Sequence, residues 1–220
     1  MGSRTRPPKT TVDAGTRRRL LEAAAQCFAA RGFEATTVRE VCRKAHANGA
    51  SVNYHFGSKE RLYLETIRWA TTLCHAANTA QVVEAGKDRS LSPRQRFVAV
   101  VRLFAKGVLH EQPEWHLRLM WREMTHPSVA MDAIVREFIR PRFNAMSEAV
   151  RALRPAADER TVTLLSMSVV GQILYHRFAA PVALKLLGER AYDAALVDAI
   201  VEHVVAFSLR ALESGPGSAA

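Results

Sequence analysis

The chain has 220 residues, of which 48% are apolar and 24% are charged, and its formal net charge is +10. This composition allows a sizeable core, and no apolar run approaches the roughly 20 residues that a membrane span needs. The segment from Met1 to Thr16 is basic and polar and lacks the apolar stretch of a secretory signal. We therefore expect a cytoplasmic protein that does not bind membranes.

The three cysteines are Cys27, Cys42 and Cys74, and they form no CxxC pair and no spacing typical of metal ligands. Cys27 and Cys42 fall on apolar helical faces, where a free thiol behaves as a small hydrophobic group. We expect reduced core thiols, no metal site and no cofactor.

Almost every segment has the three-and-four spacing of apolar residues that is typical of helices, and none sustains the alternation of a strand. The sequence therefore predicts an all-α fold. Predicted helices lie at about 16–31, 38–45, 50–56, 58–83, 93–110, 113–125, 128–153, 158–187 and 190–213.

The first three predicted helices have the pattern of a helix-turn-helix domain. Helix 16–31 buries a face that includes Leu20 and Phe28, and Gly32 suits its C-terminal cap. Thr37 and Glu40 have the spacing of a capping box at the start of the second helix, and Asn48 is a plausible N-cap of the third. Two short helices joined by a tight turn behind a first helix are typical of DNA-binding domains.

In the third helix, Val52 and Phe56 are four residues apart and are expected to face inward. The remaining surface then carries small or polar residues without acidic charge, which suits the edges of bases in the major groove. Residues 1–61 also carry 12 Lys/Arg against 5 Asp/Glu, and such a basic excess favours a polyanionic partner. Asn53 is expected to pair with an adenine edge, whereas Tyr54 and His55 are expected to reach phosphates, with packing inside the domain as their alternative.

Phosphates are also expected at the helix starts marked by Thr37 and Lys59, because exposed N–H groups and a cation attract anions. The alternative for Lys59 is a solvated pair with Glu60 or Glu65. Arg39 is expected to contact a base or a phosphate. Four further arginines are candidates for backbone or minor-groove contacts, although any basic arm would have this composition: Arg4, Arg6, Arg17 and Arg18.

The sequence from about Thr16 to Ile67 resembles the TetR family of bacterial regulators, most specifically in Tyr54-His55-Phe56 followed by Lys59 and Leu62. Asn53 departs from the pattern because many members have Tyr there. The resemblance implies a DNA-contacting set of Thr37, Arg39, Asn48, Gly49, Ala50, Ser51, Asn53, Tyr54, His55 and Lys59. Residues 137–141 and 171–178 also resemble a TetR subgroup with a CecR-like C-terminal domain.

The region from residue 62 onward is too long and too apolar to serve only as a support. Its aromatic, sulfur-containing and polar side chains suit a pocket for a small apolar or aromatic effector, although for any single residue a core position is the alternative. The candidate ligand-binding residues are Phe104, Trp115, Met120, Trp121, Met124, Phe138, Gln172, Tyr175 and His176. The resemblance implies that such an effector moves the DNA-binding domains of a dimer apart.

Helices 158–187 and 190–213 have extended apolar faces and are predicted to form the interface of a homodimer, with an intrachain core as the alternative. The predicted faces consist of Leu164, Leu165, Val169, Gln172 and Ile173 in the first helix and Leu196, Ile200, Val204 and Phe207 in the second. Dimerisation is favoured because two reading heads recognise a pseudo-palindrome in double-stranded DNA with more specificity than one.

We therefore predict a disordered basic arm (1–15), a DNA-binding domain (16–62), an effector-binding and dimerisation domain (63–213) and a disordered tail (214–220). The predicted function is that of a sequence-specific transcriptional regulator, a repressor released by its ligand. The alternatives are an activator, a non-specific architectural DNA-binding protein and a helical ligand-binding protein without DNA function. Common catalytic motifs such as HExxH and GxSxG are absent from the sequence, so we expect no enzyme.

Overall fold

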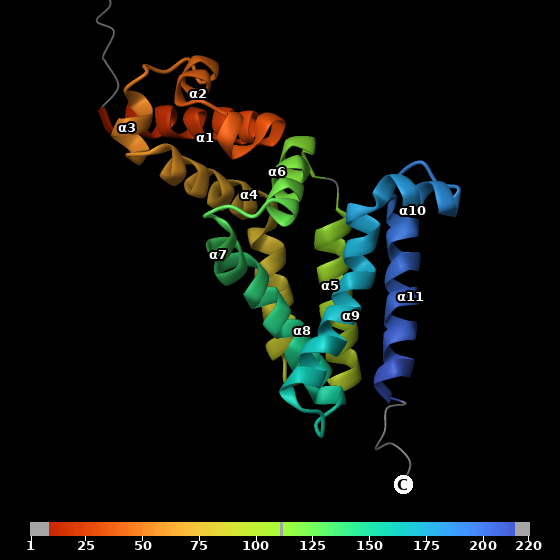
Figure 1. Ribbon diagram of the computed structural model, residues 1–220. Coiled ribbons are helices and arrows are strands. Elements are labelled where there is room, and N and C mark those ends of the chain that lie inside the picture. The colour runs from red at the N-terminus through yellow and green to blue at the C-terminus, as the bar shows by residue number, and fades with distance from the viewer. Residues whose placement is uncertain (1–8, 111, 214–220) are drawn as a thin grey trace, which may run out of the picture. The chain divides into compact units, whose positions relative to one another are not determined.

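The computed structural model describes residues 9–110 and 112–213, and every regular element among them is a helix (Figure 1), which confirms the predicted all-α class. The elements are α1 (Lys9–Ala35), α2 (Val38–Lys44), α3 (Ser51–Phe56), α4 (Lys59–Lys87), α5 (Pro93–Leu109), α6 (Glu114–Thr125), α7 (Met131–Ile134), the π-helix η1 (Val135–Ile139), α8 (Arg140–Leu153), α9 (Glu159–Phe178), α10 (Ala180–Leu187) and α11 (Ala194–Glu213).

The described residues form two compact units. The first, which we call the head unit, lies within Met1–Cys74 and Gln112–Val135, and the second, the C-terminal unit, lies within His75–Glu111 and Arg136–Ala220. The sequence predicted one continuous domain over 63–213, whereas the structure assigns α6 and α7 to the head unit.

α6 belongs to the head unit because it packs along α1 and buries polar as well as apolar groups there. Arg122 donates from Nε to the carbonyl of Ala29 at 3.1 Å and from Nη2 to that of Ala30 at 2.9 Å. The buried carboxylate of Glu123 accepts hydrogen bonds from the Tyr63 hydroxyl of α4 and from the backbone N–H of Ser128. Two side chains of α6, Arg122 and Glu123, therefore fix it to α1 and α4.

The N-terminal helix is longer than the sequence predicted. α1 begins at Lys9, so the prediction of disorder is wrong for residues 9–15, while residues 1–8 and the predicted tail 214–220 lie outside the described residues. Gly32 interrupts the helical geometry with φ 80° and ψ 176°, which lies outside the left-handed helical region of the predicted C-terminal cap, and α1 continues to Ala35.

The predicted helix 158–187 is two helices. α9 ends at Phe178 and α10 begins at Ala180, because Pro181 has no N–H to donate and its ring clashes with a continuing helix. The backbone of Ala179 accordingly leaves the helical region, with φ −101° and ψ 23°.

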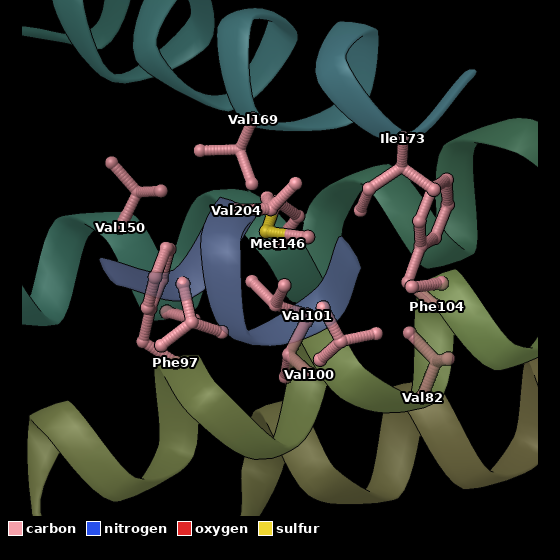
Figure 2. Close-up of a cluster of buried hydrophobic side chains, with 14 of the residues drawn as sticks. Val82, Phe97, Val100, Val101, Phe104, Met146, Val150, Val169, Ile173 and Val204 are labelled. Carbon is pink, nitrogen blue, oxygen red and sulfur yellow. The ribbon is translucent and has the colours of Figure 1, made fainter. Parts of the chain in front are cut away.

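The core of the C-terminal unit is built from α4, α5, α8, α9 and α11 (Figure 2). Phe97 and Phe104 of α5 pack with Met146 of α8 and Ile173 of α9 in this cluster. Four residues from the predicted dimer faces are also buried in it, so for them the intrachain core is correct: Val169, Ile173, Ile200 and Val204.

The cysteines are free, as predicted; Cys27 and Cys42 are buried and Cys74 is partly buried. Burial raises the pKa of the Cys27 and Cys74 thiols. Within residues 9–110 and 112–213, no helix combines the length and apolarity of a membrane span, and no group of three metal-binding side chains gathers.

Gly32→Ala is expected to destabilise the head unit by about 1–3 kcal/mol, because positive φ with extended ψ is open only to glycine. An added Cβ would also lie 3.2 Å from Nη1 of Arg122. Urea denaturation followed by far-UV circular dichroism measures the change. Gly49→Ala is the control, since no atom lies within 4 Å of its added Cβ. Equal stability of the two variants would contradict this account of Gly32.

Tyr63→Phe is expected to cost about 1–3 kcal/mol of unfolding free energy, because it leaves a buried carboxylate oxygen of Glu123 without its donor. Tyr54→Phe removes the same hydroxyl from a side chain that is 76% exposed, and should change stability by less than about 0.5 kcal/mol. Thermal and urea denaturation of both variants give the comparison. A loss no larger in the Tyr63 variant would show that this buried bond contributes nothing.

Candidate functional site

The turn between α2 and α3 is set by local hydrogen bonds. Thr37 caps α2, because its side chain accepts from the N–H of Glu40 at 3.2 Å. Only this half of the predicted capping box forms, since the Glu40 carboxylate pairs with Arg31 at 3.2 Å. The start of α2 is thus fixed next to the exposed Arg39.

Asn48 is not the N-cap of α3, which is Ala50. The Asn48 side chain accepts from the N–H of Ala50 at 2.9 Å and its carbonyl accepts from Ser51 at 2.9 Å. This is an Asx-turn, in which the side chain closes the loop one residue before the helix begins. At the other end of α3, Gly57 adopts φ 80° and Ser58 accepts from the N–H of Arg61, which starts α4.

α3 has one buried face and one exposed face, as predicted. Val52 and Phe56 are buried inside the head unit, whereas Asn53 and Tyr54 are exposed and Ser51 is partly exposed. Asn48, Gly49 and Ala50 in the preceding turn are exposed as well. The outward surface therefore offers amide, hydroxyl and phenol groups without a carboxylate from α3.

His55 does not lie on that outward surface. Its side chain is only 8% exposed, and Nε2 lies 3.4 Å from the carboxylate of Asp13 in α1. The structure thus favours the packing alternative for His55. Tyr54 contacts its ring edge-on, with centroids 5.0 Å apart.

Lys59 is held within the head unit. Its ammonium donates to the carbonyl of Glu34 at 3.2 Å and lies 4.5 Å from the centroid of the Phe33 ring. The alternative pair with Glu65 is not formed, because Glu65 pairs with Arg17 and Arg68. Lys59 remains partly exposed at the start of α4, where an ammonium with three donors has capacity for a further contact.

Two of the four arginines predicted to approach the DNA backbone have internal partners. Arg17 pairs with Glu65 at 2.9 Å and stacks over Phe56, and Arg18 pairs with Glu22 at 2.8 Å. Arg4 and Arg6 lie outside the described residues.

The predicted ligand-binding residues are divided between the two units. Trp115, Met120, Trp121 and Met124 lie on α6 in the head unit, and Phe104, Phe138, Gln172, Tyr175 and His176 lie in the C-terminal unit. Neither unit alone gathers the whole predicted set.

Within the C-terminal unit, several of these side chains have structural contacts. Gln172 donates to Ser208 of α11 and to the carbonyl of Ser168, so it joins two helices. Tyr175 is 48% exposed, and His176 packs edge-on against Tyr192. Phe104 is buried in the core.

Sequence reasoning missed the polar anchors of α6, Arg122 and Glu123. The one available indication was that Glu123 shares a helical face with the buried His116 and Leu119, which is an unusual place for a carboxylate. Its partner Tyr63 lies 60 positions earlier in the chain, and its partner Ser128 lies in the irregular segment between α6 and α7. A periodic sequence pattern indicates neither contact.

Two family models match the chain. The model described as the C-terminal domain of the HTH-type transcriptional dual regulator CecR matches residues 93–212, and the model of bacterial regulatory proteins of the tetR family matches residues 20–66. The first alone covers more than half of the chain.

Among characterised relatives, the HTH-type transcriptional dual regulator CecR of Shigella flexneri is 24% identical over 194 residues, which cover 85% of this chain and 86% of that protein. The HTH-type transcriptional repressor AcnR of Corynebacterium efficiens is 29% identical over 120 residues, which cover 54% of this chain and 62% of that protein.

Solved structures share the fold. A TetR-like transcriptional regulator from Rhodococcus sp. RHA1 aligns with a TM-score of 0.58 at 18% identity, over 96% of this chain and 100% of that one. The hemolysin II regulator HlyIIR aligns with a TM-score of 0.58 at 21% identity, over 87% of this chain and 97% of that one. These relatives are regulators of transcription and not enzymes. The chain therefore belongs to the TetR family of bacterial transcriptional regulators, with a C-terminal domain of the CecR type.

Proposed function

We propose that this regulator is a repressor that binds a palindromic operator as a homodimer and is released by a small apolar or aromatic effector. The observation that carries the DNA-binding part is the outward surface of α3, where Asn53 and Tyr54 are exposed while Val52 and Phe56 hold the helix in the head unit. A short helix anchored on one face and polar on the other fits the major groove.

Within this surface, roles follow from chemistry and position. The amide of Asn53 is suited to the paired donor and acceptor of adenine, and Ser51 to a base or a phosphate. Tyr54 of α3, Thr37 at the start of α2 and Lys59 at the start of α4 are assigned to phosphates, which set the register of the helix without reading sequence, and Arg39 is assigned to a base or a phosphate. The turn residues Asn48, Gly49 and Ala50 present exposed backbone next to the same groove.

Repression is proposed because a protein seated on a promoter excludes polymerase, and because AcnR of Corynebacterium efficiens is named a repressor. The Shigella flexneri relative is named a dual regulator, so activation at other promoters is compatible with the same binding surface.

Homodimerisation is supported by an exposed apolar stripe on α9. Its residues follow one another at spacings of three or four, namely Leu164, Met167, Gly171, Tyr175 and Phe178, and its four large side chains are 40–55% exposed. A Cβ added to Gly171 would meet no atom within 4 Å, which leaves room for the close approach of another helix. Phe207 of α11, a helix that packs on α9 (Figure 1), is also exposed. Of the predicted dimer faces, Leu164 and Phe207 therefore remain exposed, whereas Val169, Ile173, Ile200 and Val204 are buried. Two such faces related by a twofold axis would present two reading heads to a palindrome.

Release by an effector is supported by the position of α6. Along the chain it follows α5 and leads through α7 and η1 to α8 of the C-terminal unit, yet it is fixed to the head unit through Arg122 and Glu123. A ligand that shifts α5 or α8 would therefore pull on a helix that is hydrogen-bonded to α1 and α4.

Asn53→Ala is expected to relax base preference at one or two operator positions, because a bidentate amide contact discriminates by about 1–3 kcal/mol. Selection of bound duplexes from a random library, followed by sequencing, measures the preference. Asn144→Ala, which alters an exposed amide on α8, is the control and should return the wild-type motif. An unchanged motif for the Asn53 variant would exclude direct reading by this side chain.

Met167→Arg is expected to weaken the dimer by about 100-fold or more, because an unpaired charge buried in an apolar interface costs about 3–5 kcal/mol. Sedimentation equilibrium measures the dimer dissociation constant. Leu73→Arg places the same charge on α4, at a side chain that is 62% exposed outside the stripe, and should leave the dimer intact. If the dimer dissociation constant of the Met167 variant equals that of the wild-type protein, the interface lies elsewhere.

A further inference from the structure

Arg142 of α8 has a fixed position but few partners. Its Nε donates to the carbonyl of Phe138 at 3.3 Å, and its guanidinium lies over the Phe104 ring, 5.9 Å from the centroid. Within the described part of the chain these are its contacts, so both terminal amino groups of the guanidinium lack a hydrogen-bond partner.

No carboxylate of the described residues lies within ion-pair distance of Arg142, although the side chain is partly buried. Exposed arginines of the same unit do have acids: Arg94 pairs with Glu213, and Arg102 pairs with Glu202. Withdrawal from water lowers the pKa of the Arg142 guanidinium. A partly buried guanidinium that has no counter-charge among the described residues is available to pair with an anion from outside the chain.

A second unmet polar group borders the same turn of α5. Asn78 of α4 donates from Nδ2 to the carbonyl of Leu103 at 2.8 Å, one residue before Phe104. The Oδ1 of Asn78 is buried and has no partner. The π-helix η1 ends three residues before Arg142, and π-turns occur frequently at functional sites.

The surroundings of these polar groups are apolar. In Figure 2 the ring of Phe104 lies beside Ile173 of α9 and above Val82 of α4, and Met146 is one helical turn beyond Arg142 on α8. A few polar groups set among apolar side chains are typical of sites for small organic ligands.

We propose that the effector is an organic carboxylate with an apolar body, and that Arg142 binds its carboxylate while the body lies against Phe104. The guanidinium presents two parallel N–H donors, which match the two oxygens of a carboxylate. A single guanidinium balances the single charge of a carboxylate, whereas a phosphate monoester carries nearly two. This inference rests on the proposed effector-released function.

Phe104 lies on α5, which precedes α6 in the chain, and Arg142 lies on α8, which follows α6 after α7 and η1. A carboxylate ligand held by both residues would change the spacing of these helices. The proposed ligand site is thus connected along the chain to the anchored helix α6, on one side from α5 and on the other through η1 and α7.

The test uses full-length protein with three carboxylates, namely octanoate, phenylbutyrate and naphthoate, and the alcohols with the same skeletons. At ten times Kd, at least one carboxylate should raise Tm by roughly 3–6 °C. The matching alcohol should bind at least about tenfold more weakly, because it cannot pair with the guanidinium. Failure of all three carboxylates, or equal affinity for acid and alcohol, would overturn the proposal.

Arg142→Met provides a readout that needs no ligand. Replacing an unpaired, partly buried charge with an apolar side chain of similar length should raise the Tm of the ligand-free protein and abolish the response to carboxylates. A lower Tm for this variant would show that Arg142 is structural and would overturn the proposal.

Arg177→Met is the matched control. Arg177 is also partly buried and its Nη2 has no partner, but it lies next to the exposed stripe residues Tyr175 and Phe178. It should keep the wild-type response to carboxylates, and loss of the response here instead of at Arg142 would place the ligand elsewhere.

Binding to an operator selected from random duplexes, measured by fluorescence anisotropy, separates the two proposals. The Arg142 variant should bind this duplex with wild-type affinity and should no longer be released by the carboxylate. A wild-type protein that binds the carboxylate but no duplex would refute the proposed function while leaving the ligand assignment intact.

Discussion

The hydrogen bond between the Tyr63 hydroxyl and the Glu123 carboxylate is the constraint on which the arrangement of the head unit depends. Both groups are buried, so neither has water as an alternative partner. Burial and the adjacent carboxylate raise the pKa of Tyr63, which keeps the phenol protonated and able to donate at any physiological pH. As long as this bond exists, α4 and α6 move together.

This constraint explains why a helix from the C-terminal half of the sequence is part of the DNA-binding half of the fold. Arg122 adds two bonds to carbonyls of α1, just before the interruption at Gly32. α1 and α4 are therefore hydrogen-bonded to α6, which follows α5 in the chain and leads through α7 and η1 to α8. In the proposed mechanism, binding energy at Phe104 and Arg142 reaches the reading helix through these attachments.

Patterns with a short period predicted much of the fold. The spacing of Val52 and Phe56 correctly oriented α3, and the T-x-x-E motif located the start of α2. Contacts between distant residues were not predictable in this way. His55 contacts Asp13, 42 positions earlier in the chain, and Glu123 of α6 contacts Tyr63, 60 positions earlier. Pro181 could have indicated the break between α9 and α10, but the apolar pattern continues on both sides of it, so the sequence predicted a single helix.

The position of α6 also limits how such regulators can recombine. The CecR-type match begins at residue 93, so an exchange of modules at that sequence boundary would separate α6 from the Tyr63 and α1 surfaces that complement it. The new head unit would then pack against an α6 from another protein. The Glu123 carboxylate of that helix would lack the hydroxyl donor that Tyr63 of α4 supplies here. A chimera that keeps these contacts would have to include residues 112–135 together with residues 1–74, two segments that are not contiguous in the sequence.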